Sequence, residues 1–196
     1  MWVSRVKCVT HRRNPLFQVL LTGQPVTENH ILKNVPFEAS MYNFLKQQFP
    51  TVSAVNVLPA GGVQTEVVVS MTQRNYGDAR HVILAAMASN LRPKYVVVVD
   101  DDIDVHNLDQ VNWAIAYRSI PGKDTIIVED VPSSPLDPSS YLPDTHGVKL
   151  EWSQLAKMRQ NGALGIDATF PFGLPHEAIA DVPGWKEYDF PELDER

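Results

Sequence analysis

Four aspartates, Asp100, Asp101, Asp102 and Asp104, directly follow the apolar run Tyr95–Val99. A β-branched run of this kind predicts a strand that is covered on both faces. Ligands of open α/β sheets bind beyond the carboxyl ends of the strands, and closely spaced carboxylates are ligands that Mg²⁺ and Mn²⁺ prefer. The aspartate cluster is therefore the first candidate for chemistry in this chain.

Two interpretations of the cluster stay open at this point. In the first, Asp100 and Asp102 hold a divalent metal, because an apolar strand that runs into such a motif is similar to the metal site of nucleotide-sugar glycosyltransferases. In the second, the carboxylates cap turns, accept backbone hydrogen bonds and pair with nearby basic groups. The alternatives for function are thus a metal-dependent glycosyltransferase-like domain and a non-catalytic interaction module.

Composition narrows the function classes. The chain has 196 residues with 17 Lys and Arg against 23 Asp and Glu, a net charge of -6 that argues against a nucleic-acid partner. Its one cysteine, Cys8, excludes an internal disulfide, and we expect it to be a buried, inert thiol on a strand. No apolar run approaches the roughly 20 residues that a membrane helix needs, so we expect no membrane insertion and a cytoplasmic location.

The first half of the chain alternates between strand and helix patterns. Expected strands are Val3–Thr10, Phe17–Leu21, Val52–Leu58 and Glu66–Met71, and the last two should form a hairpin around Gly61 and Gly62. An apolar stripe between Glu28 and Gln48 predicts a helix that Pro36 can begin at a first-turn position. A second stripe, with Gly77 and Asp78 at its start, predicts a helix over residues 77–87.

The second half predicts a central strand over residues 94–99, a helix capped by Asn107 that buries Trp113, and a strand over residues 124–128. This succession should form a βαβ unit. Residues 131–148 are a Pro- and Ser-rich loop, residues 150–160 form a short helix at best, and 162–196 are an irregular tail. We expect a single α/β domain over 1–196, with a mixed sheet, a central βαβ unit, helices on both faces and an irregular C-terminal tail.

Four segments in order resemble the C-terminal region of UbiD-family (3-octaprenyl-4-hydroxybenzoate carboxy-lyase-like) decarboxylases. They are Val9–Pro15, Gly77–Val82, Val98–Val105 leading to Val111–Ala114, and Leu136–Ser139 with Gly165–Thr169. The resemblance implies a lyase, a carboxy-lyase that decarboxylates an aromatic, heteroaromatic or unsaturated acid with prenylated FMN, a divalent metal (Mn or Mg) and potassium. It also implies that a flavin-binding domain or subunit, absent from this sequence, holds these cofactors and the catalytic residues.

The resemblance assigns this chain a role in oligomerisation and active-site closure, within a homo- or hetero-oligomer, and predicts that the isolated chain is inactive. No catalytic residue is expected here, and Leu16, Phe17 and Gln18 are expected to face the substrate pocket. The resemblance also implies a lysine two residues before the glycine of the Gly165–Thr169 motif, where it would meet the flavin phosphate. Ala163 stands at that position here, and Lys157 is the substitute that the sequence offers. The resemblance makes the aspartate cluster an architectural motif.

Overall fold

The computed structural model describes residues 3–17, 19, 26–132, 134, 137, 139–142, 144 and 146–174. Five strands form one mixed sheet in the order β1-β2-β3-β5-β4. They are β1 (Val52–Val57), β2 (Glu66–Met71), β3 (Tyr95–Asp100), β4 (Thr125–Pro132) and β5 (Gln160–Asp167). β2, β3 and β5 run parallel, and antiparallel β1 and β4 form the two edges. The predicted α/β class with a mixed sheet is confirmed.

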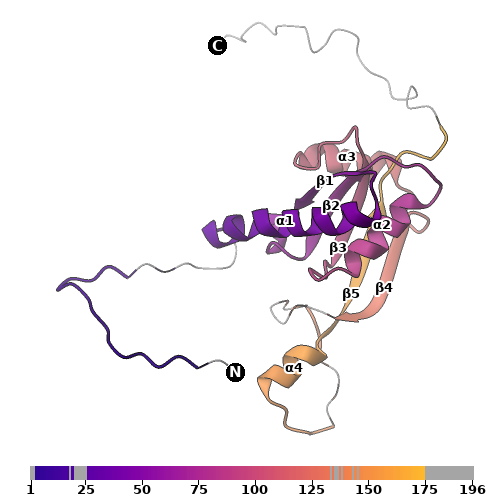
Figure 1. The fold of residues 1–196 in the computed structure, drawn as a ribbon. Helices are drawn as coiled ribbons and strands as arrows, with labels where there is room; N and C mark the ends of the chain where they lie inside the picture. The colour runs from indigo at the N-terminus through magenta and orange to yellow at the C-terminus, as the bar shows by residue number, and fades with distance from the viewer. Residues whose placement is uncertain are drawn as a thin grey trace, which may run out of the picture.

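Helices cover both faces of this sheet (Figure 1). On one face lie α1 (Glu28–Gln48) and α2 (Asp78–Met87), and on the other lies α3 (Leu108–Arg118). The short α4 (Trp152–Met158) lies away from the sheet, below β4 and β5 in the same view. None of the helices in the described part of the chain is long and apolar enough to cross a membrane.

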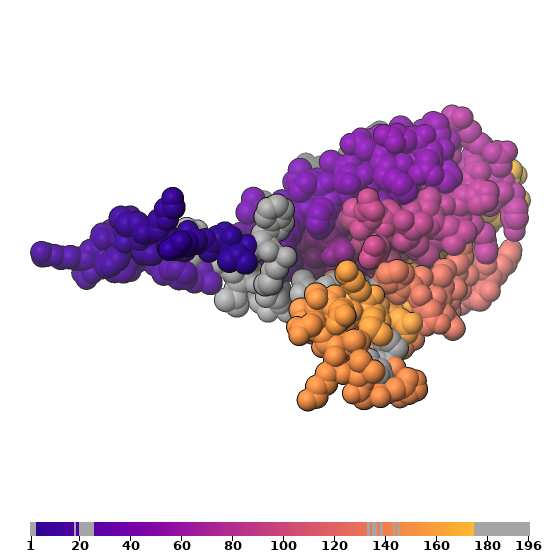
Figure 2. Space-filling view, turned by 60° about the horizontal axis from the view of Figure 1, so that its bottom comes forward, coloured from indigo at the N-terminus to yellow at the C-terminus, as the bar shows by residue number. Residues whose placement is uncertain are grey.

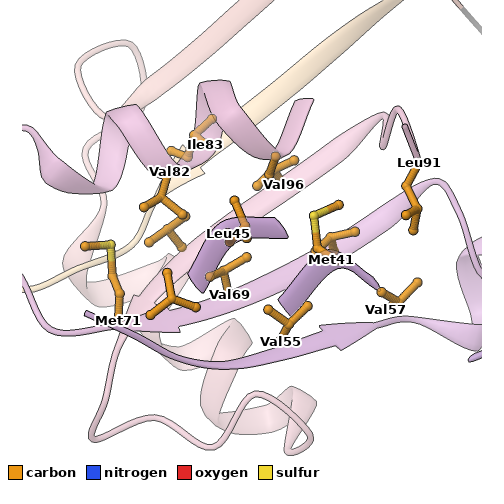
Figure 3. Close-up of a cluster of buried hydrophobic side chains, with 14 of the residues drawn as sticks. Met41, Leu45, Val55, Val57, Val69, Met71, Val82, Ile83, Leu91 and Val96 are labelled. Atoms are coloured by element: carbon orange, nitrogen blue, oxygen red, sulfur yellow. The ribbon is translucent and has the colours of Figure 1, made fainter. Parts of the chain in front are cut away.

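Alternating strand residues build two cores, because successive side chains of a strand point to opposite faces. Val96 and Val98 of β3 face the helix pair α1 and α2, whereas Val97 and Val99 face α3. The larger core also contains Met41, Leu45, Val55, Val57, Val69, Met71, Val82, Ile83 and Leu91 (Figure 3). This double coverage confirms the prediction that 95–99 is a central strand buried on both faces.

The structure confirms several local predictions about helix caps and turns. Asn107 caps α3 through its side-chain oxygen, which accepts hydrogen bonds from the backbone of Asp109 and Gln110. Gly77 precedes α2 with φ +90°, a left-handed conformation that favours glycine. β1 and β2 form the predicted hairpin.

Three predictions about the elements are wrong. Pro36 lies inside α1 and does not begin it, because Thr27 and His30 bond each other at an earlier start, with the Thr27 amide donating to His30 Nδ1 at 3.1 Å. β4 is antiparallel to its neighbour β5 and does not touch β3, so the central βαβ unit is β2–α2–β3. Residues 160–167, which fall partly in the predicted irregular tail, form β5.

The N-terminal prediction fails as well. Residues 3–10 form no strand and are exposed throughout, and Phe17 and Val19 also lie outside strands. Cys8 is exposed and not buried as predicted. The remainder of the predicted strand Phe17–Leu21, at residues 18, 20 and 21, lies outside the described residues.

β5 contains glycine because α2 packs directly against it. A Cβ built on Gly165 would overlap Ile83 Cγ2 and lie 3.1 Å from Met87 Cε, both on α2. Gly162 on the same strand would meet only the Val128 carbonyl oxygen, at 3.6 Å. The glycine that suggested an irregular tail is therefore the residue that allows the helix to approach the strand.

We expect Gly165→Ala to lower the free energy of unfolding by about 1–3 kcal/mol, because the added methyl group forces α2 away from β5. The matched variant Gly162→Ala should change it by less than about 0.5 kcal/mol. Urea unfolding followed by circular dichroism measures both. Equal stability of the two variants would contradict the close approach of Gly165 to Ile83.

Candidate functional site

The carboxyl ends of the three parallel strands bring the aspartate cluster to one edge of the sheet. Asp100 ends β3 in register with Met71, the last residue of β2, and Asp167 ends β5 in register with Val98 of β3. Asp101, Asp102 and the residues up to Asn107 form the loop that leads into α3. This is the edge at which open α/β sheets place their ligands.

Arg118, the last residue of α3, binds two of these aspartates. Its Nη1 lies 3.2 Å from Asp100 Oδ2 and 2.8 Å from Asp102 Oδ1, and its Nη2 lies 2.5 Å from Asp102 Oδ2. The side chains of Arg118 and Asp100 are 3% and 6% exposed, whereas Asp102, which forms the bidentate pair with Arg118, is 41% exposed. We call Arg118, Asp100 and Asp102 the arginine clamp.

Further contacts join the arginine clamp to the rest of the edge. Asp100 Oδ2 also accepts a hydrogen bond from the Phe170 amide, just after β5. The guanidinium of Arg118 lies 5.1 Å from the Trp113 ring centre and 5.9 Å from that of Phe170. The hydrogen bonds from Arg118 to Asp102 raise the pKa of Arg118 above its usual value, so the guanidinium stays charged.

Trp113 is 38% exposed, so the prediction that it is fully inside is wrong. Its ring stacks at 5.6 Å on Tyr117 and covers one side of the arginine clamp, where it shields Arg118 from water.

The other two aspartates accept hydrogen bonds from a threonine side chain and from the local backbone. Asp101 Oδ2 accepts a hydrogen bond from Thr72 Oγ1 at 2.8 Å, and Asp104 Oδ1 accepts one from the His106 amide at 2.9 Å. Within the described ranges, no group of three or more His, Cys, Asp or Glu side chains could hold a metal ion. These contacts favour the architectural interpretation of the cluster over a metal site on Asp100 and Asp102.

The amino edge of the sheet carries a second polar cluster, centred on Asp137 of the Leu136–Ser139 motif. Asp137 Oδ2 accepts from Asn161 Nδ2 at 2.6 Å and lies 3.4 Å from Lys94 Nζ, while its Oδ1 accepts from the amide and hydroxyl of Ser139 at 2.9 and 2.7 Å. Arg159 donates to the Asp137 carbonyl at 3.2 Å. This cluster ties the Pro- and Ser-rich loop to the start of β5.

The residues singled out for the substrate and the flavin lie in different places. Leu16 and Phe17 are almost fully exposed, and Gln18 lies outside the described residues. Ala163 is buried on β5 and lines an apolar groove of about 270 Å³ together with Arg92. Lys157 lies on α4 and lines a different hollow beside Arg159. Their predicted roles stay predictions.

Sequence reasoning missed Arg118 as a functional residue. It stands 16 residues beyond Asp102, and the apolar stripe of its helix does not single out Arg118 as a functional residue. The available signal was a basic residue in the last turn of a helix that follows an acidic strand end, a position where a cation also interacts favourably with the helix dipole.

A scan against family models matches residues 30–168 to the 3-octaprenyl-4-hydroxybenzoate carboxy-lyase C-terminal domain. The chain is 38% identical over 152 residues to a phenolic acid decarboxylase of Sedimentibacter hydroxybenzoicus, covering 73% of this chain and 31% of that protein. It is 31% identical over 183 residues to an anhydromevalonate phosphate decarboxylase of Methanocaldococcus jannaschii, covering 92% of this chain and 40% of the relative. The chain thus spans about a third of the length of such relatives.

Solved structures also match most of this chain and about a third of the compared chain. The chain superposes on the UbiD-class enzyme HmfF of Pelotomaculum thermopropionicum in complex with FMN with a TM-score of 0.69 and 32% identity, over 83% of this chain and 33% of that one. It superposes equally well, with a TM-score of 0.69 and 31% identity, on the closed form of vanillic acid decarboxylase from S. hydroxybenzoicus, over 91% of this chain and 36% of that one. The open form of that enzyme gives a TM-score of 0.67 at 32% identity, with the same coverage of both chains.

We expect Arg118→Gln to destabilise the fold by about 3–5 kcal/mol, because it leaves Asp100 buried without its counter-charge. Arg80→Gln is the control, since Arg80 is a half-buried arginine on α2 that forms no ion pair among the described residues and donates to the Lys123 carbonyl. Thermal and urea unfolding measure both. If Arg118→Gln were as stable as the control, the arginine clamp would not be a structural element.

A manganese titration separates the two interpretations of the aspartate cluster. We expect no micromolar binding of Mn²⁺ by calorimetry, because the side-chain oxygens of Asp100 and Asp102 are already bound by Arg118. Micromolar binding that Asp102→Ala abolishes would establish the metal site and contradict this expectation.

Asp137 should make the amino edge sensitive to acid. Burial raises the pKa of Asp137, but the hydrogen bonds from Ser139 and the nearby Lys94 outweigh it and leave the pKa below its usual value. A lowered pKa contributes stability that is fully present above the unfolded value of about 3.9 and is lost as the pH falls through the folded value. We therefore expect Asp137→Asn to be less stable than the wild type at pH 6, and the difference to shrink below about pH 4.

The measurement is urea unfolding from pH 6 to pH 3. Glu129→Gln, a neutralised carboxylate on the exposed surface of β4, is the control and should show no such convergence. A constant difference between wild type and Asp137→Asn across this range would contradict the role of the ionised Asp137.

Proposed function

We propose that this chain, which belongs to the UbiD family of decarboxylases, is the C-terminal domain or small subunit of a prenylated-flavin-dependent carboxy-lyase. The substrate class is an aromatic, heteroaromatic or unsaturated carboxylic acid. Phenolic acid decarboxylase and vanillic acid decarboxylase, with which the chain shares 38% and 31% identity, support the aromatic class.

The arginine clamp is the observation that carries the proposal of a positioning role. At the edge where an α/β sheet would place reactive groups, the carboxylates Asp100 and Asp102 bind Arg118 inside the domain. Carboxylates that are already bound to an arginine in this way stiffen the edge of the sheet and give it a fixed shape. The chain therefore contributes a rigid surface, and the catalytic groups come from the other two thirds of the enzyme.

The cofactor belongs to that other part. When bound, prenylated FMN would serve as the electron sink for the loss of CO₂. The described residues do not fit its metal, because the carboxylates at the carboxyl edge are paired with Arg118 or bonded to the local backbone and to Thr72. Mn or Mg and potassium are accordingly assigned to the flavin-binding domain, and no step is assigned to a residue of this chain.

The role of this chain is to close the site and to hold the subunits together. Closure excludes water from the reacting centre and completes the shape of the substrate pocket. The vanillic acid decarboxylase on which the chain superposes is known in an open and a closed form, which supports a moving part of this kind. Leu16, Phe17 and Gln18 are proposed to line the pocket once the partner covers them.

Co-expression tests this function. The chain is produced alone and together with the part of HmfF that precedes the region matched here, in cells that make prenylated flavin. We expect a stable complex whose native mass includes both parts, whose visible absorption shows flavin, and which decarboxylates aromatic acids, whereas the chain alone is colourless and inactive. The same HmfF part fused ahead of residue 1 repeats the test at high effective concentration.

Two outcomes of the co-expression test would contradict the proposed function. If neither the mixed nor the fused form binds flavin or decarboxylates any aromatic acid, the chain is not a working part of such an enzyme. Activity of the chain alone would contradict its assignment as a positioning domain.

A further inference from the structure

Residues 3–17, before α1, carry apolar and basic side chains that are covered by no other part of the described chain. Every residue from 3 to 17 is exposed, with Val3 at 89% and Phe17 at 90%. Its side-chain hydrogen bonds are local, such as that from Arg12 Nε to the Asn14 carbonyl at 2.7 Å. Figure 2 shows this indigo segment projecting from the body of the molecule. We call residues 3–17 the arm.

The first part of the arm has the sequence of a half-buried strand. The residues with even numbers are uncharged and small or apolar, whereas the residues with odd numbers place Arg5 and Lys7 between two valines. The even set is Ser4, Val6, Cys8 and Thr10, and the odd set is Val3, Arg5, Lys7 and Val9. Side chains of a strand alternate between faces with a period of two residues. A strand over residues 3–10 would thus present one uncharged face and one cationic face.

The charge of this region differs from that of the rest of the chain. The first 27 residues contain Arg5, Lys7, Arg12 and Arg13 and no acidic residue, although the whole chain has a net charge of -6. A surface that receives the arm must therefore be acidic on the side that faces Arg5 and Lys7.

The arm lies outside the matched domain, because the C-terminal domain match begins at residue 30. The alignment with the anhydromevalonate phosphate decarboxylase covers 92% of this chain, so it must begin at or before residue 17, the last residue of the arm. The similarity to that longer relative therefore extends beyond the C-terminal domain toward the arm.

We propose that residues 3–10 add as an edge strand to an open β-sheet of the flavin-binding domain, where acidic side chains face Arg5 and Lys7. Main-chain hydrogen bonds to an exposed sheet edge give such additions their affinity, and alternate side chains give them specificity. The inference rests on the proposed function and adds to it the surface by which the two parts join. It also accounts for a strand pattern that pairs with nothing in the described chain.

Hydrogen exchange on the complex with the HmfF part, or on its fused form, tests this inference directly. In the free chain all amides of residues 3–10 should exchange at the rate of an unfolded peptide. In the complex, alternate amides should be protected at least about 100-fold, because an edge strand directs only every second N–H to its neighbour.

A pair of proline variants provides the matched control. Proline removes one N–H, which an edge strand tolerates only where that N–H faces solvent. We expect one of Val6→Pro and Lys7→Pro to reduce recovery of the flavin-containing complex at least about tenfold, and the other to change it by less than about twofold. Neither should shift the melting temperature of the isolated chain by more than about 1 °C, because the arm is exposed there.

The outcomes separate this inference from the proposed function. A flavin-containing, active complex in which residues 3–10 stay unprotected, or in which both proline variants are harmless, overturns the strand addition alone. Equal damage by both variants places the arm between two strands and also overturns edge addition. No complex in either the mixed or the fused form overturns both.

Discussion

The burial of one arginine is the constraint on which the carboxyl edge of this domain depends. Arg118 reaches its position only because α3 ends there, and once buried it requires anionic partners, since an unpaired guanidinium inside a protein is strongly unfavourable. Asp100 at the end of β3 and Asp102 in the following loop meet that requirement from two directions. The Phe170 amide shares Asp100, which ties the segment after β5 to the same centre. The strand order at this edge and the position of α3 are therefore fixed by one charge cluster.

A second constraint acts on the opposite face, where α2 lies against β5 with no room for a side chain at Gly165. This close approach buries Ile83 and Val82 against the strands. It also determines the neighbourhood of Ala163, whose side chain is buried beside the same helix. A long cationic side chain at 163 would have to leave between α2 and β4. Arg92 already lies along that groove, which places a positive charge near the position where the family resemblance led us to expect a lysine.

The sequence predicted the elements whose signals are local and failed where the signal lies elsewhere in the chain. β2, α2, β3 and the Asn107 cap follow from apolar periodicity and capping residues within the same ten positions. β5 was missed because Gly162 and Gly165 signal irregular structure locally, while the glycine at 165 is required by a helix some 80 residues earlier. Arg118 was missed for the same kind of reason, because its partners are defined by the fold and not by their spacing. The parallel pairing of β3 with β5 was missed for the same reason. Local patterns do not show whether β4 or β5 lies next to β3 in the sheet.

The failed prediction at the N-terminus has a different origin. There the local signal for a strand is good, but a strand is stable only when a neighbour pairs its N–H and C=O groups, and the edge strands of this sheet lie at β1 and β4, away from the arm. Those two edges are occupied on one side and carry their own irregularities in register. The domain thus combines two covered cores with an arm whose strand pattern finds no sheet among the described residues. Exposed apolar side chains mark surfaces that another chain or domain can cover, and this is why the proposed partner is placed on the side of the arm.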